Sequence, residues 1–397
     1  MLQLLLVLLL SNLSHAKFEA PGFELVVTTP VEAGLDAGEL RGPGEVWKEL
    51  IDGAKSRLDF GQMYASGQAG EPLDEILDHL EAAGGRGVKV RFLLEEKMMR
   101  ASVEETVARL RKIPNLELRI LDFSKLSAGG ILHAKYIVAD GKRAFVGSPN
   151  FDWRSLKHVH ETGLLISDAR LVKQIGEIFA IDWNAWTQVS QGKRVPTRFA
   201  YRANSREAGR AYLVASPKAF LPVGVRNSEE ELPRLIGEAK REIRVQVLDY
   251  APLRRDGSFY PVIDNALRAA LARGVKVKLL VSHWNLGEPE IAHLQSLSLI
   301  PGIEVRFAKL PMASSGPIPF ARVNHSKFMT IDESLAWVGT SNWTGGYLDK
   351  TRNLEVVVKD PALAARLSRV HGQLWDAPYT CQLDPLKAYE EPKKDGR

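Results

Sequence analysis

The chain has 397 residues but only one cysteine, Cys381, and this scarcity excludes several kinds of protein. An intramolecular disulfide framework, a multi-cysteine zinc site and an iron–sulfur cluster each need several cysteines. Long apolar runs are also scarce, because the longest, residues 2–10, falls short of the ~20 apolar residues that a membrane-spanning helix takes. The composition, 45% hydrophobic and 25% charged, excludes a mostly disordered chain and predicts a soluble protein with a sizeable core.

The first sixteen residues differ from the rest of the chain. Residues 2–10 are Leu and Val except for Gln3, and they are followed by the small residues Ser14 and Ala16, at positions −3 and −1 of a cleavage before Lys17. This layout is typical of a secretory signal peptide, and it predicts an exported protein, periplasmic or secreted, with no stable membrane span after cleavage. No Lys or Arg precedes the apolar run, so an uncleaved anchor or a misassigned start is the alternative.

The body of the chain is an internal duplication. The segment Gly87–Leu94 returns as Gly274–Val281, and Leu132–Tyr136 returns at a slightly larger offset as Asn324–Phe328. Copies that keep their order while their spacing drifts indicate duplication with loop insertions. In each copy, short apolar runs rich in Val and Ile alternate with helical patterns, which predicts α/β layering with buried strands.

The duplication predicts a domain organisation. We expect a signal peptide at residues 1–16, an N-terminal half at 17–190, a connector at 191–211, a C-terminal half at 212–380 and a tail at 381–397. The connector contains Glu207 and six basic residues, Lys193, Arg194, Arg198, Arg202, Arg206 and Arg210, so its excess of five positive charges equals the net charge of the whole chain, +5. It is either a solvated linker or a basic lip beside a site for phosphodiester anions.

The duplicated segment carries a matched set of polar residues. The first copy has His133, Lys135 and Asp140, and the second has His325, Lys327 and Asp332 at the same spacing. We expect both sets on strands, Ile131–Ala139 and Val323–Ile331, where His and Lys share one face and the Asp lies on the other.

Each copy continues with a further motif. Gly147-Ser148-x-Asn150 follows the first set and Gly339-Thr340-Ser341-Asn342 follows the second. A glutamate comes next in each copy, Glu161 after His133 and Glu355 after His325, at nearly the same spacing. A single His-x-Lys sequence is a weak signal. Two copies, each followed by Asp, Asn and Glu at matched spacing, indicate a functional site.

These residue types suit a phosphate. A histidine oriented by a carboxylate can act as a nucleophile or as a general acid. Two lysines and two asparagines can hold non-bridging oxygens and neutralise charge as phosphorus becomes five-coordinate. Two facing half-sites would supply one histidine for attack and one to protonate the leaving group.

The paired motifs resemble the HKD motifs of the phospholipase D superfamily. Phe151–Leu156, Gly339–Trp343, Leu248–Tyr250 and Val281–Trp284 further resemble the phospholipase-D-like 5′ exonucleases of animal lysosomes and their poxviral and bacterial relatives. This resemblance covers residues 22–380, and it implies two α/β halves with mixed sheets flanked by helices and one active site at their interface.

The resemblance also implies roles for single residues. His133 would attack phosphorus and form a phosphohistidine, and His325 would protonate the leaving oxygen and then activate water; the reverse assignment is the alternative. Lys135, Lys327, Asn150 and Asn342 would bind phosphate, and Glu161 and Glu355 would orient the imidazoles. Ser148 and Thr340 belong to the motifs, and Asp140 and Asp332 would brace the structure. No metal or other cofactor is implied.

Three functions follow, in order of preference. The first is a metal-independent phosphodiesterase that acts on single-stranded nucleic acid from a 5′ end. The second is a phospholipase D or phosphatidyltransferase that acts on phospholipids. The third, a non-catalytic binding module, is disfavoured by the intact double motif. Because both half-sites lie in one chain, the site needs no second copy, and the oligomeric state stays open.

Overall fold

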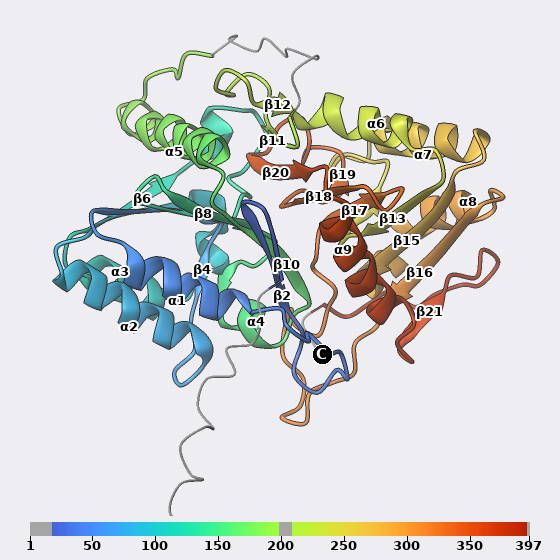
Figure 1. Cartoon of the computed structure of the whole chain (residues 1–397), viewed down its shortest axis with the longest axis horizontal. Helices are drawn as coiled ribbons and strands as arrows, with labels where there is room; N and C mark the ends of the chain where they lie inside the picture. Colours follow the sequence, from blue (N-terminus) through green and yellow to red (C-terminus); the bar gives the residue numbers. More distant parts are fainter. Residues whose placement is uncertain (1–17, 198–208, 395–397) are drawn as a thin grey trace, which may run out of the picture.

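The computed structural model describes residues 18–197 and 209–394 (Figure 1). Each half of the chain builds one large mixed sheet, and the two sheets have corresponding strand orders. The predicted signal peptide and the middle of the predicted connector lie outside the described residues.

The N-terminal sheet has eight strands. In spatial order they are β1 (Glu19–Ala20), β2 (Phe23–Thr28), β10 (Glu161–Ile166), β8 (Arg143–Gly147), β7 (Tyr136–Ala139), β3 (Arg57–Gly61), β5 (Lys89–Glu95) and β6 (Leu116–Leu121). Strands β3, β5 and β6 run parallel, and β3, β7, β8, β10 and β2 pair antiparallel.

The C-terminal sheet repeats this arrangement with nine strands. In spatial order they are β12 (Arg226–Asn227), β11 (Ala211–Ser216), β20 (Asn353–Val358), β18 (Leu335–Gly339), β17 (Phe328–Ile331), β13 (Glu242–Gln246), β15 (Lys276–Ser282), β16 (Ile303–Ala308) and β21 (Thr380–Gln382). Strand β21 pairs with β16 and Leu383 is buried, so this sheet extends past the boundary expected at residue 380. Two short pairs complete the strands: β4 (Ala65–Ser66) with β9 (Phe151–Asp152), and β14 (Tyr250–Ala251) with β19 (Trp343–Thr344).

Helices cover the sheets. They are α1 (Pro43–Gly53), α2 (Pro72–Gly85), α3 (Glu104–Lys112), α4 (Trp153–Lys157), α5 (Ala169–Ser190), α6 (Ser228–Glu238), α7 (Val262–Ala272), α8 (Glu290–Ser298) and α9 (Pro361–Trp375), with short 3-10 turns at Glu96–Ala101, Phe123–Lys125 and His283–Leu286. In Figure 1, α1 to α3 lie on the outer side of the N-terminal sheet, and α6 to α8 lie beside the C-terminal sheet. No helix in the described part of the chain is long and apolar enough to cross a membrane.

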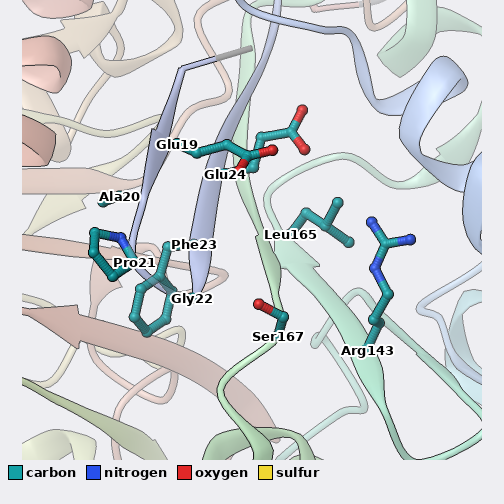
Figure 2. Close-up of a pocket in the computed structure, with 9 residues that line it drawn as sticks. All are labelled: Glu19, Ala20, Pro21, Gly22, Phe23, Glu24, Arg143, Leu165 and Ser167. Carbon is teal, nitrogen blue, oxygen red and sulfur yellow. The ribbon is translucent and has the colours of Figure 1, made fainter.

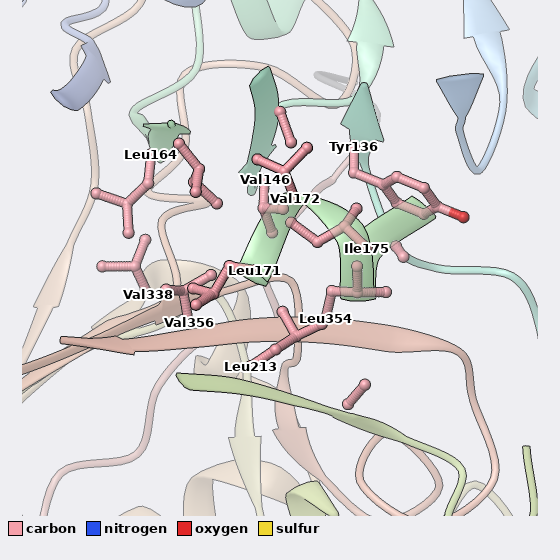
Figure 3. Packing of buried hydrophobic residues seen from close by; sticks show 14 of the residues in the cluster. Tyr136, Val146, Leu164, Leu171, Val172, Ile175, Leu213, Val338, Leu354 and Val356 are labelled. Atoms are coloured by element: carbon pink, nitrogen blue, oxygen red, sulfur yellow. The ribbon is translucent and has the colours of Figure 1, made fainter. Parts of the chain in front are cut away.

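One hydrophobic core joins the two halves. Val146 and Leu164 of the first sheet belong to the same buried cluster as Val338 and Val356 of the second (Figure 3). Helix α5 adds side chains such as Ile175 to this cluster. Burial of apolar surface stabilises by roughly 25 cal/mol per Å², so this shared core holds the two sheets in a fixed relation.

Candidate active site

Each motif histidine is positioned by the backbone of the opposite half. The amide of His133 donates to the carbonyl of Arg352 at 3.0 Å, and the amide of His325 donates to the carbonyl of His160 at 2.9 Å. Leu132 and Asn324, the preceding residues, form isolated bridges to the same two partners. The two motif segments therefore meet at the interface, where the sequence placed a single site.

The strands expected at Ile131–Ala139 and Val323–Ile331 are shorter than predicted. Strand β7 begins at Tyr136 and β17 at Phe328, so both histidines precede their strands. The cause is the backbone hydrogen bonding of each histidine to the opposite half, because backbone groups that bond across the interface are not available to a neighbouring strand of the sheet.

His325 is bound to a carboxylate of the N-terminal half. Its Nδ1 lies 2.8 Å from Glu161 Oε2 and 3.0 Å from Oε1. Glu161 is fully buried, and burial raises its pKa to about 7 against the lowering effect of Lys327 and the hydroxyls of Ser148 and Ser155. Burial and the two motif lysines lower the pKa of His325, whereas the adjoining carboxylate favours its imidazolium form. The contact places the ring and the carboxylate where one proton can pass between them.

His133 has a neutral partner instead. Its Nδ1 lies 2.9 Å from Asn353 Oδ1. The amide of Asn353 has a fixed orientation, because its Nδ2 donates to the Tyr347 carbonyl at 2.8 Å and its Oδ1 accepts the Thr340 hydroxyl at 2.8 Å. Oδ1 can only accept, so Nδ1 of His133 carries the proton and its Nε2 keeps the lone pair. Burial and the motif lysines hold the pKa of His133 well below its usual value, which favours this neutral ring.

Glu355 does not take the position expected for it. It is fully buried, and its carboxylate accepts hydroxyls of Ser228 and Ser341 rather than a histidine. Burial raises its pKa to about 7. The residue that corresponds to Glu161 is Asn353, which follows His325 at the same spacing as Glu161 follows His133. Equal spacing was the signal that could have identified it.

Both motif lysines are buried in the site. Lys327 Nζ donates to the His325 carbonyl at 2.6 Å, and Lys135 Nζ bonds the His133 carbonyl in the same way. Burial lowers the pKa of Lys327 to about 7 and that of Lys135 well below its usual range, against the raising effect of Glu161 on both. An arriving phosphate would favour the charged form of both lysines.

The two motif asparagines have unused hydrogen-bonding capacity. Within the described residues, the buried amide oxygens of Asn150 and Asn342 have no hydrogen-bond partner. Asn342 Nδ2 donates to Asp249 Oδ2 at 3.1 Å. Asp249 was not among the predicted site residues, although it lies in Leu248–Tyr250, a segment that carries the family resemblance. Buried polar groups are rarely left unpaired, so these amides suit a polar ligand.

The motif aspartates lie at the other end of the strands. Asp140 accepts the backbone amides of Lys55, Ser56 and Arg57 at 2.8 Å each. Asp332 accepts those of residues 240–242 at 2.7–2.9 Å. Both fix the turn that leads into the strand beside the motif, and neither reaches the histidines.

Other features lie away from the histidines. A cavity of about 380 Å³ lies at the β1–β2 hairpin beside Arg143 and Leu165, and none of its lining residues belongs to the motifs (Figure 2). At the connector's end, Arg210 donates to the carbonyl of Pro21 and bonds Asp360. No group of three or more His, Cys, Asp or Glu side chains in the described ranges could hold a metal ion.

Comparison with known proteins places this geometry in a family. The family model for "Cardiolipin synthase, PLD-like domain" matches residues 47–183 and again residues 232–375. The chain belongs to the phospholipase D-like family. Phospholipase D Z of Dictyostelium discoideum is 33% identical over 85% of this chain and 85% of its own. The 5′-3′ exonuclease PLD3 of Homo sapiens is 30% identical over 91% of this chain and 81% of its own.

Solved structures share the fold of this phospholipase D-like chain. The phosphatidylserine synthase of Haemophilus influenzae matches with a TM-score of 0.66 over 92% of this chain and 88% of its own, at 13% identity. At that identity the likeness concerns the architecture alone, in which two mixed sheets form one unit.

Proposed function

We propose that the chain hydrolyses phosphodiesters through a phosphohistidine, without a metal ion, and that single-stranded nucleic acid is its substrate. The observation that carries the chemistry is the unlike environment of the two imidazoles. One is a neutral ring with a free Nε2 lone pair, and the other is bound to a buried glutamate that can stabilise its protonated form. A nucleophile and a general acid need these two states.

The first step uses both histidines. Nε2 of His133 attacks phosphorus while Nδ1–H stays bonded to Asn353. The phosphorus–oxygen bond to the leaving group breaks, and that oxygen takes the proton of His325, whose Nδ1 is held by Glu161. Lys135 and Lys327 contact the non-bridging oxygens and stabilise the negative charge of the five-coordinate transition state.

The second step restores the site. His325, now neutral, takes a proton from water, and the resulting hydroxide bonds to phosphorus. The phosphorus–nitrogen bond breaks, its electron pair returns to His133 Nε2, and the phosphomonoester leaves. Asn150 and Asn342 would hold the phosphate oxygens through both steps.

The choice of nucleic acid rests on two observations. A relative named as a 5′-3′ exonuclease aligns with 91% of this chain, and the connector carries a local positive excess that would favour an extended polyanion. A phospholipid substrate is the second candidate, because a relative of 33% identity is named a phospholipase D. We further propose that residues 1–16 are a signal peptide and that the protein is exported.

One experiment separates the substrates. Residues 17–397 would be incubated in EDTA with a 5′-end-defined single-stranded oligonucleotide and, separately, with vesicles of phosphatidylcholine or phosphatidylglycerol. We expect mononucleotide release without choline or glycerol release. Headgroup release without nucleotide release would overturn the nucleic-acid assignment, and activity that appears only after a metal is added would overturn the metal-free mechanism.

A further inference from the structure

A second pocket lies at the boundary between the halves, and one of its lining residues, Tyr347, contacts His133. Its volume is about 170 Å³, and its lining includes Gly129 from the first half and Arg254, Arg255, Tyr347 and Lys350 from the second. It is therefore formed at the same interface as the active site, by residues outside the paired motifs.

Tyr347 links this pocket to the catalytic groups. Its ring centroid lies 4.9 Å from that of His133 in an edge-on contact, and its carbonyl accepts Nδ2 of Asn353. Its hydroxyl interacts with both Asn342 and Arg255, and the Arg255 guanidinium lies 5.9 Å from the ring centroid. One side chain thus separates the nucleophile from a guanidinium.

Two cations of the pocket form no ion pair within the described residues. Arg254 is engaged, since it pairs with Asp349 and lies over Tyr260. Arg255 and Lys350, by contrast, have no carboxylate within ion-pair distance among residues 18–197 and 209–394.

One acidic residue also lines the pocket. The carboxylate of Asp256 accepts the backbone amide of Ser258 at 3.0 Å and its hydroxyl at 2.6 Å, and Lys350 helps to lower its pKa. The Asp256 carboxylate is thus hydrogen-bonded within its own turn. With Arg254 paired to Asp349, the charges of Arg255 and Lys350 outweigh that of Asp256, and the pocket keeps a net positive charge.

We propose that this pocket binds the phosphate next to the scissile one in a single-stranded oligonucleotide. The inference rests on the proposed function, and it names residues that would favour an oligonucleotide over a phospholipid as the substrate. A polynucleotide carries one phosphate per nucleotide, whereas phosphatidylcholine and phosphatidylglycerol carry only the scissile group. A guanidinium and an ammonium beside one cavity match a phosphate, the first through its fork of donors and the second as a point charge.

The test compares two substrates. A thymidine oligonucleotide has neighbouring phosphates, and bis(p-nitrophenyl) phosphate has only the scissile one. In R255A/K350A we expect KM for the oligonucleotide to rise about tenfold relative to KM for bis(p-nitrophenyl) phosphate. The dependence of log kcat/KM on log salt should also become shallower, by roughly 0.7 for a lost phosphate contact.

The chain supplies a matched control. Lys89 and Lys276 are exposed residues at equivalent places in the two repeats, at the starts of β5 and β15. Those strand starts adjoin the turns bound by Asp140 and Asp332, at the end of each sheet away from the histidines. K89A/K276A removes the same charge, and we expect the ratio of the two KM values to stay as in the unsubstituted protein. An equal rise in the control would mean that long-range charge, and not the pocket, is responsible.

Binding without turnover separates this inference from the proposed function. In an H133A background, fluorescence anisotropy of a labelled oligonucleotide should show Kd about tenfold higher after R255A/K350A. An unchanged Kd would overturn the assignment of this pocket as a phosphate site even if the oligonucleotide is cleaved. Absence of cleavage by the unsubstituted protein would overturn the proposed function while the anisotropy result still decides the pocket. R255Q/K350Q repeats the test if the alanine variant fails to fold.

Discussion

The two half-sites of this molecule share a motif but differ in what holds each histidine. His325 is bound by a buried carboxylate, Glu161, and His133 is bound by a neutral amide, Asn353, at the corresponding place. Duplication supplies two similar imidazoles, and one position that differs between the repeats, Glu161 against Asn353, gives their Nδ1 atoms different partners. In the proposed mechanism, the division of labour between the halves therefore follows from the Nδ1 partners and not from the motif.

The supports behind the half-sites differ as well. The carbonyl that accepts the His325 amide belongs to His160, whose ring lies 2.9 Å from the Ser326 hydroxyl. The carbonyl that accepts the His133 amide belongs to Arg352, whose guanidinium forms two bonds of 2.7–2.9 Å with Asp182. Both partners of that ion pair are fully buried. The His133 half-site thus depends on an ionic contact that its counterpart lacks.

Removing either imidazole is expected to have the largest effect. H133A and H325A should each lower oligonucleotide hydrolysis by about 10⁴-fold or more, since one removes the proposed nucleophile and the other the proposed proton donor. Bis(p-nitrophenyl) phosphate, with its weakly basic leaving group, distinguishes them. In rapid mixing, H325A should release up to one equivalent of p-nitrophenolate and retain a phosphoenzyme, and H133A should release none. A burst in H133A alone would exchange the two roles.

The buried ion pair gives the next largest effect. D182N leaves the Arg352 guanidinium buried without a counter-charge, and we expect the free energy of unfolding to fall by about 3–5 kcal/mol. Urea denaturation measures it. E177Q is the control on the same helix, because the Lys173–Glu177 pair is exposed and should contribute about 0–1 kcal/mol. Similar losses of unfolding free energy in D182N and E177Q would show that the buried pair contributes no more to stability than the exposed pair.

Replacing Glu161 and Glu355 in turn tests which of the two glutamates supports a histidine. E161Q should lower kcat by about 10²-fold, because His325 loses the carboxylate that stabilises its imidazolium, and E355Q should lower it by less than about tenfold. The pH profile supplies a second readout. The pKa of Glu161 is raised to about 7, so the proton that it shares with His325 is lost as pH rises through that value, and activity should fall there. In E161Q the fall should begin at lower pH. Equal losses in the two variants would return Glu355 to the role predicted from sequence.

The motifs supplied most of the candidate residues of this site, and there are physical reasons why they could not supply the others. The order and spacing of the two copies identified the duplication and selected both histidines, both lysines and both asparagines as candidates. Asn353 and Glu355 are two positions apart on β20, so they share one face, and a search for a carboxylate alone selects the wrong one. The crossed contacts of His133 with Arg352 and of His325 with His160 depend on how the halves pack, which no local pattern records. Tyr347 and Arg255 lie in turns outside the paired motifs.

Making the half-sites alike is the subtlest test of the comparison. N353D would give His133 a carboxylate like that of His325. The pKa of His133 is held well below its usual value by burial and the motif lysines, so the neutral nucleophile persists into mildly acidic solution. An adjacent carboxylate raises that pKa by roughly 1–3 units, and the acidic limb of kcat/KM should move to higher pH by a similar amount. A melting curve for N353D controls for disturbance of the Tyr347 loop. An acidic limb that stays in place in a folded variant would mean that His133 is not the group whose neutral form is required.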